Sequence, residues 1–267
     1  MVGRDTPGLV PRSATADAPR LLETPTPVPP ATARNLGVAE ATGDAFLFTD
    51  ADCRPRPGWL DTLAAALGRS PVAGGAVAFD LETDNRWALA DNIASFHELL
   101  ADRPADDDTQ APLGSLNLAV TRQGWETAGP FDEELVTSED FDWVLRARRA
   151  GLATAFEPAA VVEHADVRDD LAAVRAHARW YGSHLHAFRR RHPGVVGSGP
   201  TWASRPLLRL AAPLKAHLAA RAIFRSHSHL QAVKDRALPG VVEFKKAWYG
   251  AVLDTWPRGD DAGKGPP

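Results

Sequence analysis

Residues 33–63, ARNLGVAEATGDAFLFTDADCRPRPGWLDTL, decide the fold class. A short helical pattern comes first. The compact apolar run AFLFT follows it and ends in the acidic tripeptide Asp50-Ala51-Asp52. A Pro-Gly pair and the apolar spacing after it predict a second helix. A buried strand between two helices indicates an α/β protein.

The composition excludes several classes of protein. A chain of 267 residues with an ordinary apolar fraction is long enough to bury a sizeable core. Its formal net charge of -4 lacks the positive excess that phosphate binding requires, so we expect no nucleic-acid partner. Cys53 is the only cysteine, which rules out an intramolecular disulfide and fits a cytoplasmic location. We find neither a signal-peptide pattern nor a run of about 20 apolar residues.

The acidic tripeptide stands where an apolar strand runs out into a loop. In open α/β sheets, ligands bind at the carboxyl ends of the strands. Asp50 and Asp52 could therefore meet a hydrated divalent cation and its phosphates there. The alternative is that these residues only occupy a turn before Pro55, since such short patterns are common.

Further elements follow along the chain. The patterns VAGGAVAFDLE and SLNLAVT predict strands, residues 86–100 predict a helix, and ADRPADDDTQAP predicts a surface loop. Residues 137–150 predict a helix with Thr137 as N-cap and Asp140 as its capping-box partner. Two short strands, ATAFE and AVVE, are expected before His164, and a long amphipathic helix after it.

Residues 33–63 resemble, nearly position for position, a segment of the family-2 glycosyltransferases in which an Ala-Arg-Asn helix precedes an Asp-x-Asp strand. The resemblance implies that Asp50 contacts the nucleotide and its ribose. It also implies that Asp52 coordinates Mg²⁺ or Mn²⁺ at the donor diphosphate. Arg34 and Asn35 are assigned to the donor site by the same match, with structural support of the strand end as the alternative.

Residues 114–165 resemble the acceptor half of the same family, where a Glu-Asp pair opens a helix. The match implies that Asp140 is the catalytic base, and that Glu139 hydrogen-bonds an acceptor hydroxyl. Asn117 and Trp143 are assigned to acceptor binding, and His164 to the metal. The alternatives are that Asp140 only caps its helix, that Trp143 packs in the core, and that His164 only ends a strand.

The resemblance implies a GT-A fold, the Rossmann-like nucleotide-diphospho-sugar transferase fold with a mixed sheet flanked by helices. Residues 33–166 would form a partial catalytic domain between a Pro-rich lead-in, residues 1–32, and a helical C-terminal extension, residues 167–267. Relatives begin with strands ending in Pro-x-Tyr-Asn and Asp-Asp-Gly-Ser, and neither motif occurs here. We therefore expect an N-terminally incomplete sheet and weak donor binding.

The function implied is inverting, metal-dependent transfer from a nucleotide sugar to a hydroxyl of a glycan or lipid-linked acceptor. For such a transfer, a base must take the hydroxyl proton as the oxygen attacks. A non-catalytic carbohydrate-binding or scaffold protein is the alternative from another class. A nucleotidyltransferase is a weaker alternative, which the Glu-Asp pair disfavours.

The C-terminal part carries a leucine stripe with basic flanks. Four leucines share one helical face, and four basic residues lie beside them: Leu207, Leu210, Leu214, Leu218, Arg205, Arg209, Lys215 and Arg221. Such a face suits peripheral contact with an anionic membrane at the inner side. Packing of the stripe onto the catalytic domain is the alternative, and Pro213 predicts a break in the helix.

Overall fold

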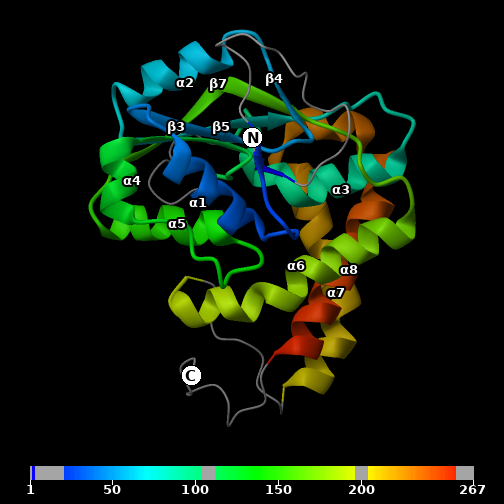
Figure 1. Ribbon diagram of the computed structural model, residues 1–267. Helices are drawn as coiled ribbons and strands as arrows, with labels where there is room; N and C mark the ends of the chain where they lie inside the picture. The colour runs from blue at the N-terminus through cyan, green and yellow to red at the C-terminus, as the bar shows by residue number, and fades with distance from the viewer. Residues whose placement is uncertain (1, 4–20, 104–111, 196–203, 257–267) are drawn as a thin grey trace.

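A mixed β-sheet lies at the centre of the protein, with helices on both faces (Figure 1). The computed structural model describes residues 2–3, 21–103, 112–195 and 204–256. The sheet has the strand order β3-β6-β5-β7-β4, in which β5 and β7 are parallel and the other neighbours are antiparallel. Its strands are β3 (Ala45–Thr49), β6 (Asn117–Thr121), β5 (Val72–Ala78), β7 (Thr154–His164) and β4 (Cys53–Pro55). A separate two-residue pair joins β1 (Val2–Gly3) and β2 (Leu22–Glu23).

Alternation along β3 sends its side chains into two different cores. Phe46 and Phe48 pack with α1, α4 and α5, whereas Leu47 packs on the other side against α2. The helices are α1 (Pro30–Glu40), α2 (Trp59–Leu67), α4 (Arg122–Ala128) and α5 (Glu139–Arg149). Figure 1 shows α2 above the sheet and the other three below it. This confirms the predicted fold class of a mixed sheet flanked by helices.

The two strands predicted before His164 are one continuous strand, β7. The prediction of two strands was wrong because the break in the apolar pattern is a change of register, not an end. The pairing of β5 with β7 shifts between Gly75 and Ala76. A Cβ atom on Gly75 would lie 2.2 Å from the Ala160 carbonyl oxygen, so only glycine allows this close approach.

The C-terminal part is a cluster of helices. Its members are α6 (Leu171–Arg191), α7 (Arg205–Ser226), η3 (Ser228–Val233) and α8 (Lys234–Thr255). From earlier in the chain, α3 (Arg86–Phe96) packs with them and is followed by η1 (His97–Leu99). The buried side chains of α3, α6, α7 and α8 form one apolar core. Because α3 also borders the sheet region, this core joins the C-terminal helices to the rest of the protein (Figure 1).

Helix α7 continues through Pro213, so the break predicted there was wrong. Pro213 is exposed, and water can satisfy the carbonyl group that loses its partner at such a position. The leucine stripe is exposed as well: Leu207, Leu210, Leu214 and Leu218 keep 69, 80, 64 and 54% of their accessible surface. The alternative that this face packs onto the catalytic domain was therefore wrong. Within the described ranges, no helix has the length and apolarity to cross a membrane.

The start of α1 differs from the predicted boundary. Helix α1 begins at Pro30, three residues before the expected boundary at residue 33, because proline is well suited to the first turn of a helix. Most of the predicted loop ADRPADDDTQAP lies outside the described residues.

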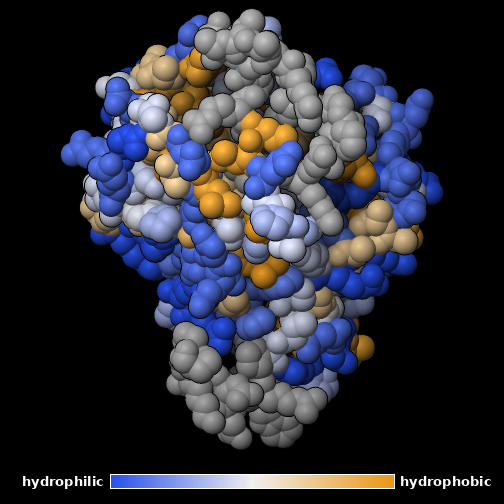
Figure 2. Space-filling view, viewed as in Figure 1, coloured by the Kyte–Doolittle hydropathy of each residue, from blue (hydrophilic) through white to orange (hydrophobic). Residues whose placement is uncertain are grey.

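On the face in Figure 2, hydrophobic residues gather in the middle, between α1 and α3, and hydrophilic ones surround them. These two helices both border the cavity described below.

Candidate functional site

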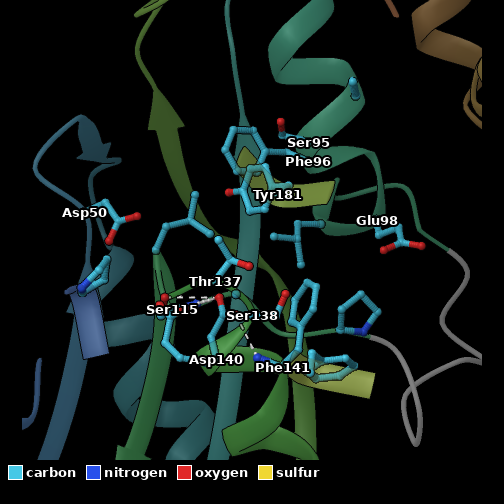
Figure 3. A pocket seen from close by; sticks show the side chains of 18 of the residues that line it. Asp50, Ser95, Phe96, Glu98, Ser115, Thr137, Ser138, Asp140, Phe141 and Tyr181 are labelled. Atoms are coloured by element: carbon cyan, nitrogen blue, oxygen red, sulfur yellow. Dashed lines mark hydrogen bonds between the residues drawn. The ribbon is translucent and has the colours of Figure 1, made fainter. Parts of the chain in front are cut away.

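One cavity of about 690 Å³ brings together acidic residues that are far apart in the sequence. This size is typical of pockets that bind small molecules. The predicted site residues that line it are Arg34, Asp50, Asp52, Glu139, Asp140 and His164. Figure 3 shows Asp50 on one side of the cavity and Asp140 below its middle. The carboxyl end of β3 and the start of α5 therefore face the same space.

Arg34 connects the two acidic groups directly. Its Nη2 donates to Asp50 Oδ1 at 2.7 Å, and its Nη1 donates to Glu139 Oε1 at 2.6 Å. The side chains of Arg34 and Glu139 are only 14% and 8% exposed, whereas that of Asp50 is 41% exposed. A guanidinium has donors in a fixed planar fork, which suits the holding of two carboxylates at once. Arg34 thus fixes α1, the end of β3 and the start of α5 relative to one another.

Asp52 and His164 meet because their strands pair. In the antiparallel ladder of β4 and β7, Cys53 lies opposite His164, and the next backbone hydrogen bond joins Ala165 N to Asp52 O. His164 Nε2 consequently lies 3.5 Å from Asp52 Oδ2. The hydrogen bond from His164 lowers the pKa of Asp52, against an opposing effect of burial. Two groups that often bind divalent metals are therefore adjacent at the edge of the cavity.

The turn before α5 holds Asp140 differently from the predicted capping box. Asp140 Oδ2 accepts hydrogen bonds from Ser115 N at 2.9 Å and Ser115 Oγ at 3.2 Å, and Oδ1 accepts one from Phe141 N (Figure 3). The N-cap is Ser138, which makes no side-chain cap, and Thr137 Oγ1 has no partner. The capping-box prediction was wrong because a residue from another segment, Ser115, binds the carboxylate.

Burial and crowding of negative charge perturb the titration of this site. Burial raises the pKa of Glu139, and the Asp140 carboxylate raises it further, while Arg34 opposes both. Burial and the same two carboxylates raise the pKa of Tyr181, whose ring comes from α6. Burial and the charges of Asp50 and Asp52 raise the pKa of Cys53 to about 12. An acidic cavity of this kind favours a bound cation or a proton-accepting role.

Asn117 lies outside the cavity lining, and its amide is fully occupied. It is 1% exposed, its Nδ2 donates to Ala76 O and Ala160 O at 2.8 Å each, and its Oδ1 accepts from Trp59 Nε1. These bonds satisfy carbonyl groups beside the register shift of β5 and β7. Burial and these internal bonds favour a structural role for Asn117 over acceptor binding.

Asn35 and Trp143 also have structural positions. Asn35 donates to Phe131 O and Glu133 Oε1 and accepts from Phe131 N, so it fixes the turn after α4, and it does not line the cavity. Trp143 has no exposed surface and stacks on Trp125 with ring centroids 5.6 Å apart. It belongs to the buried apolar cluster that contains Trp125 and Phe131, and it does not line the cavity. These contacts favour a structural role for Asn35, at the turn after α4, and the stated alternative of core packing for Trp143.

The sequence reasoning missed one wall of the cavity. Residues from two C-terminal helices line it with largely aromatic side chains: His177, Trp180, Tyr181, Leu185 and Phe188 from α6, and Phe244, Lys245 and Trp248 from α8. A signal was present, since Tyr181, Leu185 and Phe188 belong to the apolar stripe predicted for the long helix. The stripe predicts an amphipathic helix but not this wall, because periodicity does not tell a core from a cavity wall.

Comparisons with known proteins find similarity to glycosyltransferases. Residues 17–120 match the family model described as glycosyl transferase family 2. The match includes Arg34, Asp50 and Asp52 but ends before Glu139 and Asp140. The grouping of the two acidic pairs therefore rests on the geometry of the cavity.

The chain matches only part of the length of its curated relatives. The chain is 32% identical over 169 residues to the "Pre-mycofactocin glycosyltransferase" of Mycobacterium tuberculosis, which is 61% of this chain and 36% of the relative. It is 29% identical over 126 residues to "Glycosyltransferase AglE" of Haloferax volcanii, which is 46% of this chain and 40% of the relative. The chain thus spans about two fifths or less of the length of these two relatives.

Solved structures show a distant likeness. The mannosyltransferase PcManGT from Pyrobaculum calidifontis, solved with GDP-Man and Mn²⁺, has 18% identity and a TM-score of 0.48, over 87% of this chain and 68% of that one. S. aureus TarS residues 1–349, solved with UDP-GlcNAc, has 13% identity and a TM-score of 0.42, over 86% of this chain and 74% of that one.

Proposed function

We propose that the protein transfers a sugar from a nucleotide-diphosphate donor to a hydroxyl acceptor, with inversion at the anomeric carbon. The observation that carries this proposal is a single cavity in which Arg34 bridges Asp50 and Glu139, with Asp52 and Asp140 on the same lining. One acidic group serves the donor and the other serves the acceptor. The glycosyltransferase relatives and the family match support the same class of reaction.

The donor side consists of Asp50, Asp52 and His164. Asp52 and His164 would hold a Mg²⁺ or Mn²⁺ ion, and such ions complete their coordination with waters and substrate phosphates. The residues fit this role: His164 Nδ1 is buried without a partner, and Nε2 lies beside the Asp52 carboxylate. Within the described residues, no group of three or more His, Cys, Asp or Glu side chains forms a complete metal site. When bound, the ion would neutralise charge on the departing diphosphate.

On the acceptor side, Asp140 takes the proton of the attacking hydroxyl. Ser115 donates twice to Asp140 Oδ2 and Phe141 N donates once to Oδ1, which leaves one lone pair on Oδ1 for a substrate proton. Asp140 lies in the first turn of α5, where the helix dipole favours the ionised form. Glu139 keeps Arg34 in place and accepts a hydrogen bond from an acceptor hydroxyl. Asp50 binds the nucleotide ribose.

We expect Asp52→Asn to reduce metal-dependent donor turnover by about 100-fold or more, because it removes a charged metal ligand. The measurement is nucleotide release from millimolar UDP- and GDP-sugars with Mn²⁺, together with thermal unfolding. The melting temperature should change little, since the Asp52 side chain is 40% exposed.

Asp44→Asn is the matched control, because this exposed residue precedes the opposite end of β3. It should keep wild-type turnover. Equal turnover in Asp52→Asn and the wild type would contradict the metal assignment. Binding of sugars by a wild-type protein that never releases nucleotide would favour the non-catalytic alternative.

We also propose that the α7 leucine stripe contacts an anionic membrane surface. Helix α7 carries five basic residues and no acidic one, so its charge complements anionic headgroups: Arg205, Arg209, Lys215, Arg221 and Arg225. The four exposed leucines span about 16 Å at the usual helical rise. A basic amphipathic helix with an exposed apolar face typically lies in the membrane interface.

Vesicles rich in phosphatidylglycerol should co-sediment with the protein at low salt, and less so as salt screens the charges. Leu210→Glu/Leu214→Glu should abolish this binding. Leu60→Glu is the control, because Leu60 is exposed to 59% on α2, away from the stripe. Absence of binding at low salt, or equal loss in the control, would rule out this contact.

A further inference from the structure

Buried polar atoms without hydrogen-bond partners concentrate at the cavity. Apart from two arginines that have other interactions, the buried side-chain atoms of this kind in the described residues are Ser95 Oγ, Thr137 Oγ1 and His164 Nδ1. All three residues line the same cavity. An unpaired buried hydroxyl destabilises the folded protein, and native proteins contain few of them. A ligand that pairs with these atoms would remove that cost.

Thr137 lies at the most constrained turn of the site. Thr137 is 2% exposed and immediately precedes Ser138. Ser138 has a φ of 64°, and it is the one residue other than glycine with positive φ in the described parts of the chain. Strained backbone of this kind is found mainly at functional sites. The turn holds Thr137 two residues before Glu139 and three before Asp140, and Figure 3 places Thr137 between Asp140 and Tyr181 in that view.

Aromatic rings stand on another part of the lining. Trp180 and Tyr181 are neighbours on α6, with ring centroids 5.0 Å apart and an interplanar angle of 64°. Trp180 keeps 39% of its surface accessible. Tyrosine and tryptophan offer an apolar face together with a polar tip, which suits ligands that are apolar on one face and polar at the edge.

We propose that Thr137 and Ser95 bind hydroxyl groups of the acceptor, and that the acceptor presents a hydroxylated ring whose C–H face lies on Trp180 and Tyr181. This inference rests on the proposed function, because it assigns the acceptor side of the same cavity. A hydroxyl donates one hydrogen bond and accepts two, so hydroxyl groups of a ligand complement it. An anionic group is disfavoured beside Glu139 and Asp140, and a purely apolar one would leave both hydroxyls unpaired.

The test is binding of simple glycosides in the absence of any donor. Methyl α-D-mannoside and methyl β-D-glucoside are the ring probes, and cyclohexylmethanol is a six-membered ring with one hydroxyl. Dissociation constants come from titrations followed by saturation-transfer NMR. Thr137→Val should weaken binding of at least one glycoside about tenfold, the effect of one lost hydrogen bond. Thr137→Ser should restore it, and cyclohexylmethanol binding should stay the same.

The melting temperature of Thr137→Val distinguishes a ligand-binding role of Thr137 from a structural one. Since Thr137 Oγ1 has no partner in the protein, Thr137→Val should not lower the melting temperature. Thr127→Val, at an exposed position on α4, is the matched control and should leave glycoside binding unchanged. Ser95→Ala should weaken glycoside binding in the same direction as Thr137→Val.

The inference is overturned if the wild-type protein binds neither glycoside, if Thr137→Val binds them as the wild type does, or if Thr137→Val unfolds at a clearly lower temperature. Failure of the proposed function is a different result: the glycosides bind and respond to Thr137→Val, but no nucleotide sugar is ever turned over. The binding test contains no donor and no metal, so the two failures are distinguishable.

Discussion

Asp140→Asn should lower the rate of sugar transfer by about 10²- to 10⁴-fold, the range typical of a lost general base. Asparagine has nearly the same shape, and its side-chain oxygen can still accept hydrogen bonds from Ser115. It cannot, however, take a proton from an attacking hydroxyl. The measurement is the rate of nucleotide release with water and with simple glycosides as acceptors, together with donor binding and thermal unfolding.

Donor binding and the melting temperature should both be kept in Asp140→Asn, which separates the base from a residue that only supports α5. Glu126→Gln, an exposed carboxylate on α4, is the control and should turn over donor like the wild type. A variant that keeps more than a tenth of the wild-type rate would contradict the assignment. So would a loss of rate that simply follows a loss of folded protein.

Arg34→Met should destabilise the folded protein by about 3 kcal/mol, because removal of one partner leaves a buried carboxylate without its cation. The Glu139 side chain is 8% exposed, so water can do little to replace the guanidinium. Asp50 is 41% exposed and contributes less. Urea unfolding at pH 8 measures the change, and donor turnover should fall as well, since Arg34 fixes the donor and acceptor sides relative to each other.

The loss of stability in Arg34→Met should depend on pH. Burial raises the pKa of Glu139 above its unfolded value of 4.5, so a protonated Glu139 favours folding. As the pH falls below about 7, Glu139 gains a proton and becomes neutral. Loss of the Arg34 cation beside it then destabilises the protein less. The decrease in the free energy of unfolding caused by Arg34→Met should therefore be largest at pH 8 and smaller at pH 5.5.

A double variant provides the control for this pair. Arg34→Met/Glu139→Gln should be more stable at pH 8 than Arg34→Met alone, because it removes the unpaired charge. If the two substitutions simply add, the ion pair is not coupled and the predicted role of Arg34 is wrong. Arg69→Met is a matched surface control, since Arg69 is 65% exposed and its pairing with Glu157 should contribute at most about 1 kcal/mol.

The donor side could be predicted from the sequence because its residues follow one local rule. An apolar strand that ends in two carboxylates places both at the carboxyl edge of a sheet, where ligands bind. Asp50 and Asp52 lie at that position, and both line the cavity. His164 could be placed beside Asp52 only by the resemblance, because the pairing of β4 with β7 joins positions more than a hundred residues apart.

For Asn117, Asn35 and Trp143, the fold favours a structural role over the ligand contact that the resemblance implies. Each has a side chain that could bind a substrate, and each stands in a stretch that resembles a known motif. Their donors, acceptors and ring faces are already used within the protein. Sequence reveals which bonds a side chain can make, but the folded chain decides which of them are still available to a ligand.

The sequence by itself determined the α/β class, the acidic end of β3, the amphipathic character of α6 and the leucine stripe of α7, because each depends on the order of neighbouring residues. Only the tertiary structure decided that Arg34 bridges both acidic groups, that Ser115 holds Asp140, and that α6 and α8 form a wall of the cavity. Some of those contacts join residues that are far apart in the sequence, such as Arg34 and Glu139, 105 positions apart. Their distances depend on how the sheet and helices pack together, which no local pattern records.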